Sequence, residues 1–592
     1  MLGRLRSLVV SLVLSLSLAY TMLHFLLDVD GGRVANNHLG VLGGTYHGVL
    51  VFLLAVFLAL SRWLMEVTQL VVTMRVFSTD TSGATTADTT TAAAGAPRPA
   101  TMSTSAPHLA GAAAATTTDD GPEIIIVGAG IVGASLASAL GQDNRRVMLI
   151  ERDLSEPDRI VGELLQPGGV AQLTKMNLGD CLEGIDSASI HGYSIFWRDE
   201  RVQLTYPQSA DGTPLRGRSF HHGRFIMNLR RAAAKQPTVQ VVEGTVTELL
   251  EEGDEVRGVV FKRKDTGQVS EARAPLVVVC DGLFSRFRKQ LVSEPLHSRS
   301  SFVGMVLKDL ELPFPNHGHV VLAKPSPVLL YPISSTETRI LVDVPAPMPS
   351  DLREYLLRVT APQLPDHTRA SFEQALHSGA PLRSMPAGRM HPEPLNKRGV
   401  LLLGDAFNVR NPLTGGGMAV AFTDCNIVRS ILQQVPDLSD RDRLHDLIAK
   451  RFYSERRSSV AITNVLAQAL YEVFSASLDP VMAGMQEACF RYFLLGDRFT
   501  HGPMSMLSCV CHSPLTLVYH FFSVGFYSMG RSLLPFPTPA RIRDAVRLGY
   551  LSAQILLPLL WNEHLLSPLY PRFPAPPKTT AADTATATVA AH

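Results

Sequence analysis

Residues 123–151 read EIIIVGAGIVGASLASALGQDNRRVMLIE, and this stretch decides the fold. The short β-branched run 124–127 ends at a glycine, which is typical of a buried parallel strand. Three glycines follow at the spacing of a dinucleotide-binding turn. Gly128 permits the tight turn, Gly130 lets the backbone approach a pyrophosphate, and Gly133 lets the next helix pack closely.

The second half of this unit completes a βαβ pattern. Residues 134–140 are small and helix-compatible, and the free N–H groups of the helix start would face phosphates. Residues 147–150 predict a second buried strand, and Glu151 at its end can accept hydrogen bonds from ribose hydroxyls. The unit predicts an adenine dinucleotide site whose turn comprises Gly128, Ala129, Gly130, Ile131, Val132 and Gly133.

Composition excludes several functional classes. The chain has 592 residues, so more than one folded unit is expected. Lys plus Arg number 54 and Asp plus Glu 53, so a net charge of +1 gives no electrostatic argument for nucleic acid. The six cysteines are scattered without the spacing of a zinc site or a disulfide framework, which favours reduced thiols.

The N-terminal part predicts a membrane anchor over 1–78. Residues 7–27 and 39–61 are uncharged apolar runs, each long enough to span a bilayer. Arginines before the first run and after the second predict a hairpin with both ends in the cytosol. Alternatively the first run is a signal peptide, because it has an Arg-rich start and a small-residue end.

Two low-complexity segments and two apolar C-terminal runs flank the central part of the chain. Residues 79–120 are rich in Thr and Ala and predict a disordered linker, as do residues 566–592 for the tail. Polar residues or proline interrupt the apolar runs 515–529 and 545–561. We expect both runs to form helices that pack on the protein and lie in the membrane interface, rather than true spans.

Two more strands end in a glycine and an acid. The run 276–280 leads into Asp281-Gly282, and the run 399–403 leads into Gly404-Asp405. Ligands of doubly wound folds bind at the carboxyl ends of strands, where such an acid can accept a hydrogen bond from a ribityl or ribose hydroxyl. The glycines 415–417 would let backbone N–H groups approach a flat ring or a phosphate.

The intervening segments carry further candidates. Residues 170–176 predict a helix after a Pro-Gly turn, and residues 239–243, 246–250, 256–262 and 269–274 predict strands separated by turns. His221 and His222 lack a third ligand at helical spacing, so structural histidines are favoured over a metal site. Arg224 and Arg230 lie six residues apart on an expected helix, and either is a candidate for a phosphate contact.

Three long motifs resemble the squalene monooxygenase (squalene epoxidase) family of flavin monooxygenases. They are ERDLSEPDRIVGELLQPGG at 151–169, FHHGRFIM at 220–227 and GDAFNVRNPLTGGGM at 404–418, joined by the Asp-Gly motif with Ser285 and Arg288. The resemblance covers about 123–565. Asn411 departs from the histidine that we expect at this place in the family pattern, which puts any role of an imidazole there in doubt.

The resemblance implies FAD as cofactor and squalene and O2 as substrates, with NADPH electrons delivered by a separate diflavin reductase of the endoplasmic reticulum. The catalytic part would face the cytosol on that membrane. Beyond the dinucleotide turn, the implied FAD contacts are Glu151, Arg152, Arg159, Leu164, Arg230, Val246, Asp281, Gly282, Asp405, Gly415, Gly416, Gly417 and Met418. Gln166 and Tyr193 are implied as a polar pair at the reacting edge. The expected walls of the substrate pocket are Pro412, Leu413, Phe474 and Phe490.

The fold expected from these patterns is α/β, with an FAD-binding Rossmann-like domain and an inserted β-rich substrate domain. The expected FAD-binding domain comprises 121–152, 219–300 and 384–443, the substrate domain 153–218 and 301–383, and the membrane-associated helical region 444–565. A geranylgeranyl reductase and a prenyl-binding escort of the GDP-dissociation-inhibitor type remain alternatives, because both share parts of these motifs.

Overall fold

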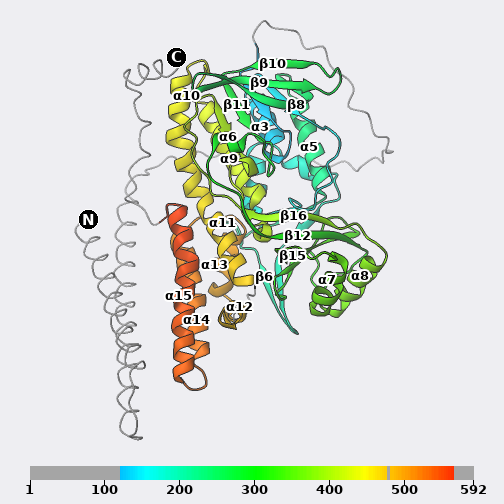
Figure 1. Ribbon diagram of the computed structural model, residues 1–592, viewed down its shortest axis with the longest axis vertical. Helices are drawn as coiled ribbons and strands as arrows, with labels where there is room; N and C mark the ends of the chain where they lie inside the picture. The colour runs from blue at the N-terminus through cyan, green and yellow to red at the C-terminus, as the bar shows by residue number, and fades with distance from the viewer. Residues whose placement is uncertain (1–120, 476–479, 566–592) are drawn as a thin grey trace, which may run out of the picture. The chain divides into compact units, whose positions relative to one another are not determined.

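The computed structural model describes residues 121–475 and 480–565 (Figure 1). The predicted anchor at 1–78, the linker at 79–120 and the tail at 566–592 lie outside the described residues.

The dinucleotide unit forms the centre of a seven-stranded sheet with the order β10-β9-β8-β2-β1-β11-β17. Its strands are β1 (Ile124–Val127), β2 (Val147–Glu151), β8 (Val239–Glu252), β9 (Glu255–Arg263), β10 (Val269–Arg273), β11 (Leu276–Val279) and β17 (Val400–Leu402). The five parallel members, β8-β2-β1-β11-β17, have the order 3-2-1-4-5 of a doubly wound fold. The α/β prediction is therefore confirmed.

Three helices pack with this sheet in one hydrophobic core: α3 (Ile131–Gln142), α5 (His222–Ala234) and α9 (Gly417–Leu432). The side chains of β1 are almost fully buried, as its continuous apolar run predicts. Helix α3 contacts both α5 and α9. It begins at Ile131, three residues before the predicted start, because Gly130 already acts as its N-cap residue.

The parallel strands end level with one another. Val127 at the end of β1 pairs with Ile150 of β2 and with Val279 of β11, and Val279 pairs with Leu402 of β17. The residues that follow each strand therefore emerge at one edge of the sheet. The two strands predicted over 239–243 and 246–250 are one strand, β8, because a register shift at Val246 absorbs the irregularity and no turn forms.

A second seven-stranded sheet has the order β16-β12-β15-β14-β13-β5-β6. Its strands are β5 (Gly192–Trp197), β6 (Glu200–Thr205), β12 (His297–Lys308), β13 (His317–Val321), β14 (Val328–Pro332), β15 (Glu337–Pro345) and β16 (Arg383–Arg389). The β-rich second layer was expected, but the predicted boundaries at 300 and 384 cut through this sheet, because β12 starts earlier and β16 belongs to it. All pairs in this sheet except β13–β5 are antiparallel.

Short elements join these layers. A three-stranded sheet contains β3 (Leu164–Leu165), β7 (Gly217–Ser219) and β4 (Ala188–Ile190). Helix α4 (Pro167–Lys175) begins three residues earlier than predicted, since Pro167 occupies the first turn, where its missing N–H is tolerated. The other short helices are η1 (Gly179–Leu182), α6 (Arg288–Leu291), α7 (Leu352–Tyr355), η2 (Leu356–Thr360), η3 (Ala361–Gln363), α8 (Asp366–His377), η4 (Gly404–Ala406) and η5 (Pro412–Thr414).

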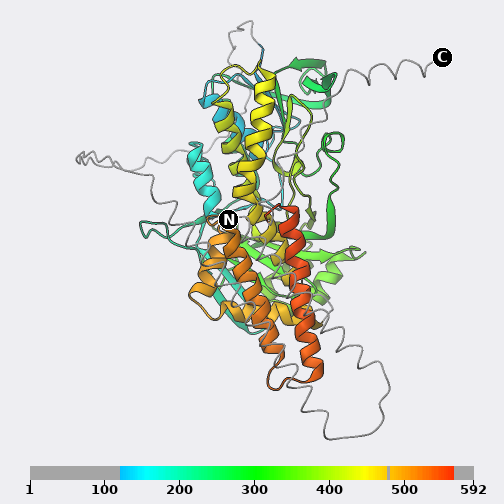
Figure 2. The same ribbon diagram turned by 90° about the vertical axis from the view of Figure 1, so that its left-hand side faces the viewer.

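The C-terminal part is helical, as predicted. It contains α10 (Arg441–Leu447), η6 (Ile448–Phe452), α11 (Tyr453–Phe474), α12 (Pro480–Phe493), α13 (Arg498–Leu507), α14 (Pro514–Ser532) and α15 (Pro539–Asn562). Helices α14 and α15 pack against each other as a hairpin, seen in orange and red in Figure 2. Within the described ranges, no helix combines the length and apolar character needed to cross a membrane.

Candidate functional site

The three glycines of the dinucleotide turn face different surroundings. A Cβ atom on Gly133 would lie 1.8 Å from the carbonyl oxygen of Gly128, and a Cβ on Gly128, whose φ is +98°, would lie 2.7 Å from the oxygen of Cys280. A Cβ on Gly130 would meet nothing within 4 Å. The protein's own packing thus requires glycine at 128 and 133. At 130 the backbone borders open space, as a site for a pyrophosphate demands.

Glu151 and Arg230 hold this turn in place. The Glu151 carboxylate accepts a hydrogen bond from the Ala129 N–H at 2.7 Å, while Arg230 donates to the Ala129 carbonyl at 2.9 Å. Arg230 is 7 % exposed and its guanidinium lies 3.8 Å from Glu151. Arg224, the other candidate on α5, donates to the Ile185 carbonyl at 3.4 Å. The structure therefore brings Arg230, and not Arg224, to the dinucleotide turn.

The Asp-Gly motif follows β11 at the same edge. One oxygen of Asp281 accepts from the Arg286 N–H at 2.9 Å, and the other is buried without a hydrogen-bond partner among the described residues. Gly282 has φ of +80° and open space in front of its Cα. An unpaired buried carboxylate oxygen beside an open backbone position fits the expected contact with a cofactor hydroxyl. Arg288 ties this motif to the next one by donating to the Asp405 carbonyl at 3.0 Å.

Asp405 lies in the short helix η4, directly after β17. Its side chain is exposed at the edge of the sheet, but the surrounding protein displaces part of the water that would solvate the carboxylate. This loss of hydration raises the pKa of the carboxyl above its ordinary value. The positive charges of Arg410, Arg159 and Arg288 oppose that rise. Arg159 comes from a segment some 250 residues earlier in the chain, so its charge on Asp405 brings residues of two motifs into the same neighbourhood.

The glycine run 415–417 is less open than predicted. A Cβ on Gly415, whose φ is +61°, would lie 2.9 Å from Leu164, and one on Gly416 would lie 2.6 Å from Thr463. Only Gly417, at the start of α9, leaves room, with Arg410 at 3.7 Å. Side chains of the protein itself therefore occupy the space beside the first two glycines, and the predicted approach of their backbone N–H groups to the cofactor stays a prediction. Met418 is buried in the core beside them.

The predicted pair Gln166 and Tyr193 is joined by a hydrogen bond. The Gln166 amide nitrogen donates to the Tyr193 hydroxyl at 2.5 Å and to the Thr414 carbonyl at 2.7 Å. Tyr206, which sequence reasoning missed, donates to the Gln166 amide oxygen at 2.6 Å. All three side chains are buried, and burial raises the pKa of Tyr193 to about 12, so its hydroxyl is neutral. No spacing in the sequence links Tyr206 to this pair.

The predicted pocket walls gather around this pair. Leu413, Phe474 and Phe490 are buried in one hydrophobic cluster together with Tyr193 and Leu164. Pro412 is half-buried and begins η5. Val246, in contrast, lies in the core cluster of the first sheet, within the part of β8 that pairs with β9.

Asn411 is the N-cap residue of η5. Its side-chain oxygen accepts from the Leu413 N–H at 3.0 Å, and the side chain is 3 % exposed. Asn411, in place of the expected histidine, therefore caps this short helix, a role that needs only a hydrogen-bond acceptor.

The segment 159–166, which carries Arg159 and Gln166, is anchored by buried side chains. Arg339 of β15 holds Glu163 with two hydrogen bonds of 2.9 and 2.8 Å, and Tyr331 donates to Glu163 at 3.2 Å. His222 donates from Nδ1 to the Gly162 carbonyl at 2.9 Å, and burial lowers the pKa of His222 to about 4.

Each of the two adjacent histidines has a partner within the protein. His222 holds Gly162, and His221 pairs with Glu337 at 2.7 Å. No cluster of three potential metal ligands occurs in the part of the chain that the structure describes.

Comparison with known proteins agrees with this geometry. The family model for squalene epoxidase matches residues 273–543. Squalene monooxygenase of Mus musculus is 48 % identical over 447 residues, covering 75 % of this chain and 78 % of the mouse protein. Squalene epoxidase of Schizosaccharomyces pombe is 40 % identical over 451 residues, covering 74 % of this chain and 98 % of the yeast protein.

Solved structures support the fold. A flavoprotein/dehydrogenase from Cytophaga hutchinsonii has a TM-score of 0.56 at 17 % identity, covering 70 % of this chain and 100 % of that one. The flavin-dependent brominase Bmp2 has a TM-score of 0.54 at 16 % identity, covering 69 % and 100 %. These likenesses concern the fold alone, whereas the identity to the mouse and yeast enzymes decides the family. This chain belongs to the squalene epoxidase family.

Proposed function

We propose that this protein is an FAD-dependent monooxygenase that converts squalene to 2,3-oxidosqualene in sterol synthesis, using O2 and electrons from NADPH. The observation that carries this proposal is the open backbone at Gly130 within a turn whose other two glycines are required by packing. It lies at the same sheet edge as Asp281 and Asp405, in a chain that belongs to the squalene epoxidase family.

The residues at the sheet edge fit FAD. Gly130 and the start of α3 would contact the pyrophosphate of FAD. Glu151 would bind the ribose, and Arg159 would pair with the charge of a phosphate. Asp281 with its unpaired oxygen, Asp405 and the open position at Gly417 would receive the flavin half. When bound and reduced, FAD supplies the activation of O2, for which the protein side chains have no equivalent.

The protein itself must orient an alkene and exclude water. Squalene has no polar group, so its binding depends on apolar surface, which Leu413, Phe474 and Phe490 provide in the cluster around Tyr193. The neutral Tyr193 hydroxyl and the Gln166 amide beside it are polar groups at this cluster, held by Tyr206 and Thr414. The hydrogen bonds of this buried network keep it in a fixed geometry, and its burial limits the access of bulk water.

Membrane association is part of the proposal and is supported by the C-terminal helices. Apolar or aromatic side chains are exposed along α14, α15 and the loop between them: Leu515, Tyr519, Phe526, Leu534, Phe536, Tyr550, Leu557 and Trp561. Such side chains favour helices lying in a membrane interface. We expect the protein on the endoplasmic reticulum membrane, facing the cytosol, where a diflavin reductase would supply electrons from NADPH.

The test is reconstitution of the full chain. Purified protein with FAD, a diflavin reductase, NADPH and squalene should consume O2 and form 2,3-oxidosqualene, detected by mass spectrometry. The Gly130→Val variant, which places a side chain where the pyrophosphate is expected, should form none and retain no flavin. NADPH consumption that saturates a prenyl chain without O2 uptake would instead indicate a reductase, and a wild-type protein unable to bind FAD would indicate a prenyl-binding escort.

A further inference from the structure

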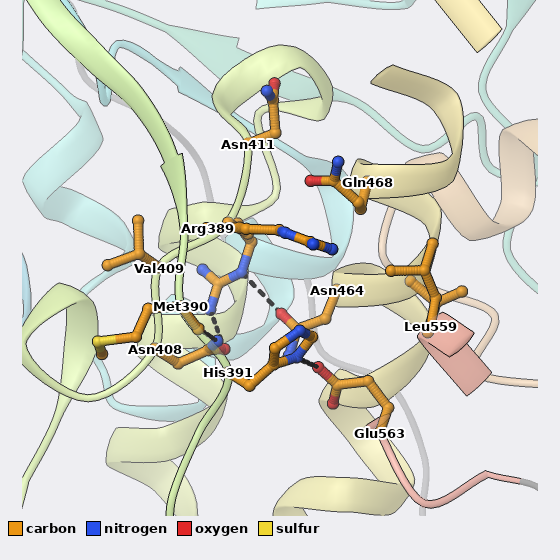
Figure 3. Close-up of a pocket in the computed structure, with 12 residues that line it drawn as sticks. Arg389, Met390, His391, Asn408, Val409, Asn411, Asn464, Gln468, Leu559 and Glu563 are labelled. Atoms are coloured by element: carbon orange, nitrogen blue, oxygen red, sulfur yellow. Dashed lines mark hydrogen bonds and ion pairs between the residues drawn. The ribbon is translucent and has the colours of Figure 1, made fainter. Parts of the chain in front are cut away.

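A line of buried polar side chains joins the end of α15 to the loop after β17 (Figure 3). The Asn464 amide nitrogen, on α11, donates to the Glu563 carboxylate at 3.0 Å. Arg410, in the loop 404–418, donates from Nε to the Asn464 oxygen at 2.9 Å. Glu563 and Asn464 are 7 % and 8 % exposed. Two hydrogen bonds therefore connect residues about 150 positions apart in the sequence.

Arg410 contacts both halves of the loop 404–418. It donates to the Gly417 carbonyl at 3.3 Å and to the Asn408 oxygen at 2.7 Å, and its charge acts on Asp405. Asp405 and Gly417 are the two positions of this loop that we assign to FAD. The orientation of the Arg410 guanidinium thus bears on both of them.

Arg410 also has a cation beside it. Arg456 donates to the same Asn408 oxygen at 2.8 Å and pairs with Asp424 at 2.9 Å. Burial, together with the charge of Arg456, lowers the pKa of Arg410, while nearby acids including Glu563 act in the opposite direction. Two guanidinium groups can share one amide oxygen only where such acids offset their repulsion.

Glu563 is an unexpected residue at its place in α15. It is the C-cap residue of the helix, where the partial negative charge of the helix end disfavours a carboxylate, and it is buried as well. Its compensation comes from Asn464 and from His391, whose Nδ1 lies 3.6 Å away. Both side chains lie beside Glu563 in Figure 3. A small cavity of about 20 Å³, enough for one water molecule, lies among these side chains.

We infer that Glu563 is a positioning residue for the FAD site. Through Asn464 it fixes the Arg410 guanidinium, and through Arg410 it fixes the loop 404–418, so that retention of FAD depends on the docking of α15. This inference rests on the proposed function, because it takes that loop as a cofactor contact. It adds that the helix carrying exposed apolar side chains and the cofactor site are physically coupled.

The experiment compares Glu563→Ala with Glu487→Ala in the full-length protein. Glu487 lies on α12 in the same helical region and pairs with Arg531 at 3.1 Å and Arg491 at 3.7 Å, neither of which belongs to the loop 404–418. FAD affinity is measured by fluorescence titration, and amide hydrogen exchange of residues 404–418 is measured in the FAD-free protein. Glu563→Ala should raise the Kd of FAD about tenfold, as expected for one lost hydrogen bond to a charged group, and should speed exchange in the loop.

The outcomes separate this inference from the proposed function. Glu563→Gln, which keeps an acceptor for Asn464, should recover most of the affinity, and Glu487→Ala should change neither readout. If Glu563→Ala lowers only the melting temperature, with Kd and loop exchange unchanged, the inference is overturned while the proposed function stands. If wild type binds no FAD, the proposed function fails first. Should Glu563→Ala not fold, Asn464→Ser, which is too short to reach both partners, is measured in the same way.

Discussion

The dinucleotide turn 128–133 and the segment 159–166 both border the proposed FAD site, but different forces hold them. In the turn, backbone packs against backbone: positions 128 and 133 have no room for a Cβ. In the segment, side chains from distant elements hold the chain, with Arg339 and Tyr331 on Glu163, His222 on Gly162, and Tyr193 and Tyr206 on Gln166.

This difference predicts different responses to mutation. A backbone clash cannot relax without moving a strand or a helix, so it should damage folding as a whole. A lost side-chain anchor leaves the backbone free to adapt, so its cost should reflect one buried group left without a partner.

The largest effect is expected from Gly133→Ala, compared with Gly130→Ala in the same turn. The new Cβ at 133 would sit 1.8 Å from the Gly128 oxygen, so we expect a loss of about 4 kcal/mol or more of unfolding free energy, or no soluble protein. The Cβ at 130 meets open space, so that variant should keep its melting temperature and lose FAD affinity. Denaturant unfolding and FAD titration separate the two, and equal stability loss in both would contradict the comparison.

Arg339→Met should have the next largest effect. It leaves the carboxylate of Glu163, which is 1 % exposed, without its bidentate partner, and breaking a buried ion pair costs about 3–5 kcal/mol. The double variant Glu163→Leu/Arg339→Met replaces the pair with apolar groups and should recover a large part of that loss. If the double variant is as unstable as the single one, the unpaired charge is not the cause.

The histidine anchor makes the stability of the segment depend on pH. Burial lowers the pKa of His222 from 6.5 to about 4, so the folded state disfavours its protonation. The contribution is fully present above pH 6.5 and is lost as the pH falls toward 4, by up to roughly 3 kcal/mol. Unfolding measured between pH 7 and pH 4 should show a shallower decline in His222→Gln than in wild type. His319, whose pKa burial also lowers to about 4, remains in both proteins and provides the internal reference.

The same contrast explains what the sequence could predict. The βαβ unit, the three strand ends and Glu151 were predictable because a local glycine pattern and apolar runs determine them. The extra turn assigned between 243 and 246 was wrong, because Gly244 lies inside a long strand that pairing with β9 stabilises. The anchors of the segment 159–166 could not be found in this way. Arg339 follows Glu163 by 176 residues, and only the assembled second sheet brings them together.

Of the variants that test the comparison between the dinucleotide turn and the segment 159–166, Tyr206→Phe should have the smallest effect. It removes the donor to the Gln166 oxygen, and since Gln166 is fully buried, that oxygen loses about 1 kcal/mol of hydrogen bonding. The amide is then held only through its nitrogen, by the Thr414 carbonyl and the Tyr193 hydroxyl, so the reacting edge loses one of the contacts that fix its geometry while the FAD contacts stay intact.

Tyr331→Phe is the matched control for this variant, because it removes a buried hydroxyl from Glu163 in the same segment, and the hydrogen bond of that hydroxyl within the described part of the chain goes to Glu163 and not to Gln166 or Tyr193. Both variants should lose about 1 kcal/mol of unfolding free energy and keep the Kd of FAD. Only Tyr206→Phe should lower the rate of oxidosqualene formation, by about fivefold for a barrier change of that size. Equal rates in the two variants would show that the Tyr206 hydroxyl contributes to the unfolding free energy and not to the reaction rate. The segment 159–166 would then resemble the dinucleotide turn, which supports the site structurally.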